Sequence, residues 1–403
     1  MPPEPRHAGY TDRTVSGGNV ISVSWGDHLV FGEGVGRLAT PDDLARRMEV
    51  WREELGATSM HWRENGSYEQ LGSLRVARGH RTRIEEANRV DWDELAVASS
   101  TARAAGISPW LYVTPLSEGW PLAPRKVREL SHHNPWHGRE VAWQSHFSRT
   151  HPEYAEIDRT GTERQWGVLS LAYPEVRAHL RDRFLDTLDG RDFDGLFVCL
   201  RSESKPAEFA DQFGFNEPVR DDFGRLTGHD IRREDFDLQA WRDLRGGYLT
   251  TFLRELKEAL APRGVKLGVG CARGDVMGPP FGNASLEWRA WVREGIVDRL
   301  VVNQDSSHCP SLWIRLWPMH AGYGYVQDYL DGRAMAPQEE HLRDTYGPVL
   351  KWSPTELFVA RQWRERSPEE EARLGEIDGV SGLVFGSFRF DNPGPVQRGD
   401  WWA

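Results

Sequence analysis

The chain has 403 residues, of which 39% are hydrophobic and 28% are charged, and 61 acidic side chains outnumber 50 basic ones. The resulting formal charge of −11 argues against a nucleic-acid partner, because such binding depends on Lys and Arg that neutralise phosphates. The longest apolar runs, such as residues 195–200, are far shorter than the roughly 20 residues of a membrane helix. We therefore expect no membrane partner.

The first 18 residues contain no apolar segment typical of a signal peptide, which favours a cytoplasmic location. Cys199, Cys271 and Cys309 form no CxxC pair, so neither a disulfide framework nor a zinc site is expected. Cys199 and Cys271 lie within apolar runs, where a small buried thiol is the ordinary interpretation. We expect no cofactor and no metal, and the oligomeric state stays open.

Short apolar runs alternate along the chain with amphipathic helical patterns. The clearest helix has Thr40 as its N-cap and Pro41 at its first position, and it ends at Gly56. The pattern predicts strands at residues 20–25, 57–62, 107–114, 195–200, 265–271, 296–303, 357–363 and 382–388. It predicts helices at residues 41–55, 91–105, 174–188, 238–260, 284–294 and 368–374. Eight strands separated by helices are typical of an α/β fold, the (β/α)8 or TIM barrel.

The connections between these elements differ in length. Helix-to-strand connections are short, whereas long strand-to-helix connections are expected near residues 63–90, 115–173, 201–236 and 304–336. In such barrels the active site is built from the loops that follow the strands. We therefore expect residues 1–403 to form a single barrel domain whose long loops at the C-terminal face of the strands surround a deep cleft.

Polar and aromatic residues gather where the predicted strands end. Aromatic rings stack on sugar faces, while Arg, amide and carboxylate groups form the directional bonds that select hydroxyls. This mixture predicts a carbohydrate substrate, and four arginines of the set keep an acidic sugar open. The predicted substrate-binding residues are Trp25, His61, Trp62, Arg63, Tyr112, Arg201, Arg273, Asp275, Asn303, Gln304, Arg361, Gln362 and Trp363.

Three carboxyl groups at strand ends are candidates for catalysis. Cleavage of a glycosidic bond needs one carboxyl group that protonates the leaving oxygen and one that acts as nucleophile or activates water. We expect Glu203 to be the general acid/base and Asp305 the nucleophile or base, with Glu64 able to replace either. A single acidic residue at a strand end is more often an ion-pair or capping partner, so the prediction depends on the set.

The central half of the chain, from residue 151 to about residue 305, resembles the family 10-like glycosyl hydrolases, bacterial TIM-barrel proteins. The resemblance is carried by His151-Pro152-Glu153-Tyr154, Asp158-Arg159, the segments 169–176, 192–195 and 213–218, and Trp241-Arg242. It implies a carbohydrate substrate and acid/base carboxylates at the barrel mouth. Many members end the 195–200 strand in adjacent acidic residues, where this chain has Cys199 and Leu200. Either the catalytic acid has moved to Glu203, or the mechanism differs.

Two alternatives to a glycoside hydrolase stay open. One is a carbohydrate-binding barrel without catalysis, which would bind glycans and leave them intact. The other is a metal-dependent barrel hydrolase that uses the histidines between residues 132 and 151. These histidines show neither HxH nor HExxH spacing, so solvated side chains are the simpler interpretation. The sugar, the linkage and the stereochemical outcome are also open.

Overall fold

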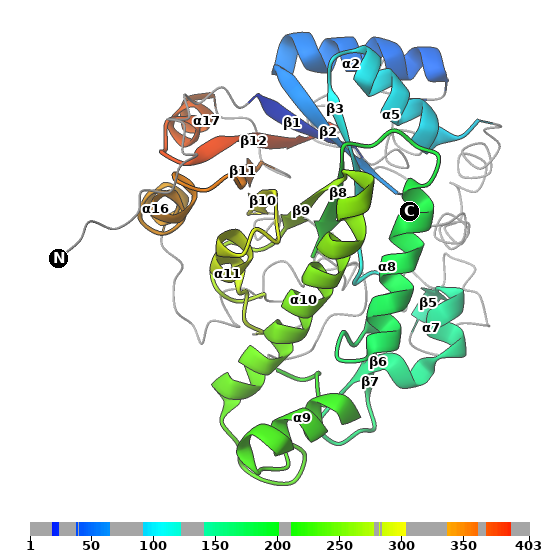
Figure 1. Cartoon of the computed structure of the whole chain (residues 1–403), viewed down its shortest axis with the longest axis vertical. Helices are drawn as coiled ribbons and strands as arrows, with labels where there is room; N and C mark the ends of the chain where they lie inside the picture. The colour runs from blue at the N-terminus through cyan, green and yellow to red at the C-terminus, as the bar shows by residue number, and fades with distance from the viewer. Residues whose placement is uncertain are drawn as a thin grey trace, which may run out of the picture.

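The computed structural model describes residues 18–23, 38, 40–64, 92–121, 141–200, 211–277, 282, 284–303, 337–361 and 368–387. Eight parallel strands form a closed barrel in the order β1-β12-β11-β10-β9-β8-β3-β2 (Figure 1). The strands are β1 (Asn19–Val23), β2 (Ala57–Arg63), β3 (Ser108–Val113), β8 (Gly195–Cys199), β9 (Lys266–Gly270), β10 (Arg299–Val302), β11 (Glu356–Ala360) and β12 (Val380–Gly386). The predicted (β/α)8 barrel and its eight strands are confirmed.

The helices between the strands also follow the predicted pattern. They include α2 (Pro41–Leu55), α5 (Glu94–Ala104), α8 (Pro174–Leu188), α10 (Leu238–Leu260), α11 (Trp288–Arg293) and α17 (Pro368–Gly375). The Thr40 side chain accepts a hydrogen bond from the Asp43 amide, and the Asp43 carboxylate accepts one from the Thr40 amide. Gly56 ends α2 with φ +65°, a conformation that favours glycine. Before β11 lie α15 (Gln338–His341), a π-helical turn and α16 (Gly347–Leu350), which the sequence did not predict.

Alternate side chains along each strand form two hydrophobic layers. The outward-facing set, such as Leu111 and Leu300, packs in one large cluster with the apolar faces of the helices. The inward-facing set fills the barrel with Val20, Trp110, Tyr112, Phe197, Cys199, Val301, Phe358, Ala360 and Val384. Because both faces of a barrel strand are buried, the strands read as nearly continuous apolar runs in the sequence. Cys199 and Cys271 are buried free thiols, as predicted, while Cys309 lies outside the described residues.

The connection between β3 and β8 has secondary structure of its own. It contains β4 (Gly119–Pro121), β5 (Val141–Gln144), α7 (His146–Thr150), β6 (Ala155–Ile157) and β7 (Arg164–Leu169), in two antiparallel pairs, β4–β5 and β6–β7. A further helix, α9 (Glu217–Thr227), follows β8. Figure 1 shows α9 and the β6–β7 hairpin beside the ends of α8 and α10 that project beyond the barrel. No helix in the described ranges has the length and apolarity needed to cross a membrane.

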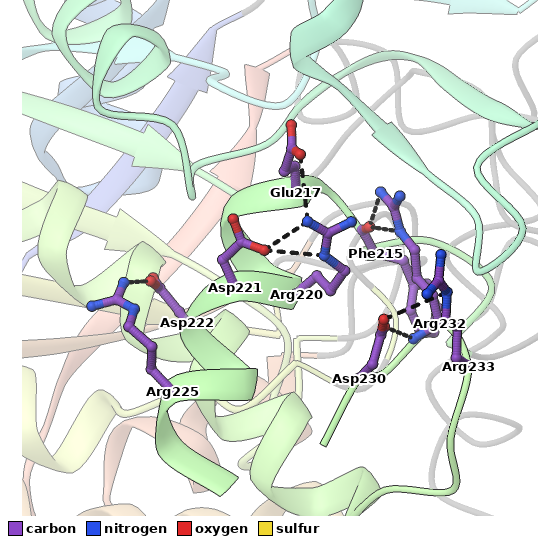
Figure 2. Close-up of polar contacts among 9 residues, drawn as sticks. All are labelled: Phe215, Glu217, Arg220, Asp221, Asp222, Arg225, Asp230, Arg232 and Arg233. Carbon is purple, nitrogen blue, oxygen red and sulfur yellow. Dashed lines mark hydrogen bonds and ion pairs between the residues drawn. The ribbon is translucent and has the colours of Figure 1, made fainter. Parts of the chain in front are cut away.

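Polar contacts surround the start of α9, and one of them joins it to the β6–β7 hairpin. Asn216 is fully buried, and its amide nitrogen donates a 2.9 Å hydrogen bond to the Ala155 carbonyl on β6. Arg232 donates two hydrogen bonds, of 2.8 and 2.6 Å, to the Phe215 carbonyl (Figure 2). Arg220 is shared between acidic neighbours on the same helix, as Figure 2 also shows. The segment 213–218, which carries part of the family resemblance, therefore connects the hairpin to α9.

Candidate active site

A largely buried cluster lies inside the barrel near the amino-terminal ends of β10 and β11, and we call Ser59, His61, Trp110, Arg299 and Glu356 the floor cluster. The Arg299 guanidinium bonds the Glu356 carboxylate at 3.1 and 2.9 Å, the Ser59 hydroxyl at 3.0 Å and His61 Nε2 at 3.1 Å. Burial, together with the charge of Arg299, lowers the pKa of His61 well below its ordinary value. His61 is thus a neutral, fully buried member of the floor cluster, which does not fit the substrate-binding role expected for it.

The inward-facing positions nearest the carboxyl ends of the strands form the barrel mouth. The Arg63 Cζ lies 5.8 Å from the centroid of the Tyr112 ring, and that ring meets Phe197 edge-on at 5.2 Å. Asn303 follows β10 with φ +61° and donates a 3.0 Å hydrogen bond to the Ala360 carbonyl on the adjacent strand. A positive φ on a residue other than glycine is costly and is concentrated at functional sites. The structure thus brings Arg63 and Tyr112 together and places Asn303 at the same end of the barrel.

Glu64 follows Arg63 at the end of β2, and its amide donates a 2.8 Å hydrogen bond to the Tyr112 carbonyl. Its side chain is half-buried and makes no hydrogen bond that involves the described residues. Burial raises the pKa of the Glu64 carboxyl, while the charge of Arg183 opposes this shift and the charge of Glu118 adds to it. A carboxyl with a raised pKa beside a barrel mouth is suited to donate a proton near neutral pH.

Two further carboxyl groups lie near Glu64, and we call Glu64, Glu94 and Glu118 the carboxyl cluster. Glu118 follows β3 and is fully buried, with one oxygen 2.7 Å from Nη1 of Arg183 on α8. Glu94 is the first residue of α5, and burial raises its pKa to about 8, with the charges of Asp93 and then Glu64 contributing to the shift. The sequence analysis named neither Glu94 nor Arg183 as a site residue. The available signals were an acidic residue at a helix start that follows a strand end, and an arginine beside the apolar stripe of α8.

Trp62 faces away from the barrel interior. Its ring is fully buried in the outer hydrophobic cluster, and its indole nitrogen donates a hydrogen bond to the Glu94 carboxylate. We expected Trp62 to stack on a sugar, but a ring enclosed between β2 and the helices offers no face to a substrate. Side chains alternate across a strand, so its neighbours His61 and Arg63 point inward while Trp62 points outward.

Arg361 also has a structural partner. Its side chain is 2% exposed and forms a bidentate ion pair with Glu370 on α17, at 3.0 and 2.7 Å. Bidentate pairing of this kind is among the strongest side-chain contacts in proteins. Arg361 thus has a structural role at the junction with α17, and its expected contact with substrate stays a prediction.

The loop after β9 carries Arg273, which is half-buried, and Asp275, which is exposed. The Asp275 carboxylate accepts a 2.7 Å hydrogen bond from the Trp288 indole and a 2.6 Å bond from Arg289, both on α11. Asp275 thus fastens its loop to α11, and its expected contact with substrate stays a prediction. The remaining predicted site residues lie outside the described residues: Trp25, Arg201, Glu203, Gln304, Asp305, Gln362 and Trp363.

The histidines that motivated the metal-dependent alternative fall partly outside the described residues. Of those within, His151 lies 3.1 Å from a Glu153 oxygen and His146 is exposed. In the described ranges, no group of three or more His, Cys, Asp or Glu side chains is placed to hold a metal ion. This part of the chain therefore offers the metal-dependent alternative no support.

No family model and no curated protein matches the chain. Its structure is similar to the glycoside hydrolase domain of PgaB (BpsB) from Bordetella bronchiseptica, with 14% sequence identity and a TM-score of 0.51, covering 93% of this chain and 96% of that domain. A β-galactosidase from the psychrophilic Marinomonas ef1 gives 10% identity and a TM-score of 0.49, covering 91% of this chain and 53% of that one. At this level of identity the similarity to PgaB shows the fold alone. The chain therefore shares a TIM-barrel fold with that domain.

Proposed function

We propose that the chain is a glycoside hydrolase that cleaves a glycosidic bond by carboxylate acid/base catalysis at the barrel mouth. The observation that carries the proposal is the Glu64 carboxyl, which is half-buried beside Arg63 at the end of β2 and has a raised pKa. Within the described part of the chain, its carboxyl makes no hydrogen bond to a structural partner. The barrel fold shared with a glycoside hydrolase domain supports the same conclusion.

In this proposal Glu64 protonates the leaving oxygen as the glycosidic bond breaks. Burial holds the proton on Glu64 to a higher pH than in water, and the adjacent Arg63 guanidinium binds a hydroxyl or carboxylate of the sugar. Glu203 and Asp305 remain the candidates for the second carboxyl, which acts as nucleophile or as base toward water. The order of the segments between residues 151 and 305 supports membership of the family 10-like glycosyl hydrolases. A single-domain chain and a cytoplasmic location stay predictions from the sequence.

The test begins with a panel of aryl glycosides and oligosaccharides that covers neutral, N-acetylated and acidic sugars. On a hydrolysed oligosaccharide, Glu64→Gln is expected to reduce kcat/KM by about 10²–10⁴-fold, the usual contribution of a general acid. On the matching 2,4-dinitrophenyl glycoside the loss is expected to be small, because this leaving group departs without a proton.

The matched control is Glu49→Gln on an exposed position of α2, which is expected to leave both activities unchanged. Equal turnover of the oligosaccharide by Glu64→Gln and the unaltered protein would show that Glu64 is not the acid. Calorimetric binding of a glycan with no product formed would instead favour a non-catalytic carbohydrate-binding barrel.

A further inference from the structure

The outward-facing Trp62 joins the end of β2 to the start of α5. Its indole nitrogen donates a hydrogen bond to the Glu94 carboxylate, and Trp62 precedes Arg63 and Glu64 in the chain. The Trp62 ring is fully buried, so the end of β2 cannot shift without moving it. The Trp62–Glu94 hydrogen bond therefore connects α5 to the end of β2, where Glu64 follows.

Charged groups from several elements surround Glu94. On α5, Asp93 is the N-cap and pairs with Arg191, whose Nη2 lies 2.9 Å from the Asp93 carboxylate. Glu64 at the end of β2 adds a negative charge near Glu94. Near Glu64 lie four further charged groups: Arg63 on β2, Arg183 on α8, Arg191 after α8 and Glu118 after β3. Helix α2 meets α5 at the opposite end, where Arg52 donates to the Ala105 carbonyl.

Two of the arginines near Glu64 and Glu94 are paired with other carboxylates. Arg191 is engaged by Asp93, and Nη1 of Arg183 is engaged by Glu118, so neither cation pairs directly with Glu64 or Glu94. Like charges close together in a buried setting cannot all ionise cheaply. A negative charge on Glu64 therefore adds to the burial that holds the proton on Glu94.

We infer that Glu94 is a positioning residue for the active site: a neutral Glu94 carboxyl, held by Trp62, keeps the end of β2 in place and leaves Glu64 free to give up and regain its proton. This inference rests on the proposed function of Glu64. Ionisation of Glu94 places a second negative charge near an ionised Glu64, which changes the charge around the end of β2. Burial raises the pKa of Glu94 to about 8. Above that pH the site therefore loses activity for two reasons: Glu64 has lost the proton that it donates, and Glu94 has become charged.

The first readout is the pH dependence of kcat/KM on the substrate that the panel identifies. In the unaltered protein the alkaline fall in activity steepens above a pH of about 8, from the loss of one proton to the loss of two. In Glu94→Gln, which keeps the acceptor for the Trp62 indole but cannot ionise, the fall stays that of one proton. Steepening that persists in Glu94→Gln overturns the inference.

The second readout does not depend on activity. Carboxyl ¹³C NMR of protein labelled with [5-¹³C]glutamate is expected to show one resonance with a midpoint of about 8 that is absent from Glu94→Gln. Removing the neighbouring charge by Glu64→Gln is expected to lower that midpoint by about 0.5–1 unit, whereas Glu49→Gln leaves it unmoved. Trp62→Phe removes the indole donor that favours the ionised form, so it is expected to raise the midpoint.

The two readouts separate the inference from the proposed function. If no Glu resonance titrates above pH 6, or if Glu64→Gln leaves the Glu94 midpoint unchanged, the coupling between the two carboxyls is absent and the inference is wrong. If Glu64→Gln retains full turnover while the NMR coupling is present, the proposed function of Glu64 fails although the carboxyls interact. In that case Glu94 does not position a catalytic acid.

Discussion

The guanidinium of Arg299 lies over the ring of Trp110, with 4.0 Å between Cζ and the ring centroid. The same Cζ lies 4.6 Å from the centroid of the Phe358 ring, and Gly195 and Gly268 leave the space that the Trp110 ring occupies. A Cβ on Gly195 would stand 2.3 Å from the ring. The interior of the barrel is thus filled at the floor cluster by a cation whose hydrogen bonds and ring contacts come from several strands.

The first prediction concerns Arg299→Lys. A lysine keeps the charge but cannot form the two hydrogen bonds to Glu356 and also lie flat against Trp110. Because the Arg299 side chain is 6% exposed, the groups left without partners stay buried. We expect a loss of about 2–4 kcal/mol in the free energy of unfolding, measured by urea denaturation.

The control for this variant is Arg254→Lys, since Arg254 forms a single 2.7 Å ion pair with Glu294 in which both side chains are about 40% exposed or more. An exposed pair of this kind contributes little, so the change is expected to stay within about 0.5 kcal/mol. Equal effects at the two positions would mean that burial of Arg299 does not matter.

Adjacent glycines in α10 provide the second prediction. A Cβ on Gly246 would stand 2.2 Å from the Ser285 backbone carbonyl oxygen, whereas a Cβ on Gly247 would meet nothing within 4 Å. We expect Gly246→Ala to lower the free energy of unfolding by about 1–3 kcal/mol, because the close approach of two backbones must open. Gly247→Ala should raise it by about 0.5–1 kcal/mol through helix propensity. Thermal unfolding of both variants checks the sign, and a stabilising Gly246→Ala would contradict the close approach.

The barrel could be predicted from the sequence because each repeat carries strong local signals. Apolar runs mark the strands, and glycines such as Gly56, Gly190 and Gly295 adopt positive φ where the helices end. The β6–β7 hairpin and α9 were missed. Only Val219 and Phe223 of α9 are buried, and they pack in a small cluster of their own with Phe215 and Trp241. Pro218 near the start of α9 and the left-handed Gly228 at its C-cap were helix signals in the sequence, but they fell inside an expected loop, residues 201–236.

The candidate site was harder to predict, since the end of a strand does not reveal which side chains face inward. His61, Trp62 and Arg63 are consecutive, yet the first lies in the floor cluster, the second contacts α5 and the third lies at the mouth. In a parallel barrel both faces of a strand are apolar and buried, so the hydrophobic pattern does not show which residues face inward and which face outward. Partners distant in sequence, such as Glu370 for Arg361, become visible only after folding.

The third prediction tests the structural role of Arg361. Glu370→Gln removes the carboxylate that pairs bidentately with a guanidinium whose side chain is 2% exposed. A buried charge that loses its partner is expensive, and we expect a loss of about 2–4 kcal/mol in the free energy of unfolding. The control is Glu339→Gln, which breaks the 2.9 Å pair with Arg373, a side chain 54% exposed, and is expected to cost less than about 0.5 kcal/mol. A Glu370→Gln protein as stable as this control would show that Arg361 does not need the pair.

The last prediction concerns the pH dependence of stability set by Glu94. In the unfolded chain this carboxyl titrates near 4.5, and in the folded protein burial raises its pKa to about 8. Between these values the folded protein holds a proton that the unfolded chain has released, so stability falls as the pH rises. The contribution of Glu94 is fully present below a pH of about 4.5 and is lost as the pH passes 8. Glu94→Gln cannot ionise, so it escapes this loss.

We expect equal stability of the Glu94→Gln protein and the unaltered protein at pH 4.5. At pH 8.5 we expect an advantage of about 1–3 kcal/mol for Glu94→Gln, after allowance for partial exposure. Glu64 titrates in both proteins, so its direct contribution largely cancels in the comparison. Urea unfolding at pH 4.5, 6.5 and 8.5 measures the difference, and two parallel stability curves would show that Glu94 is not held protonated by the fold.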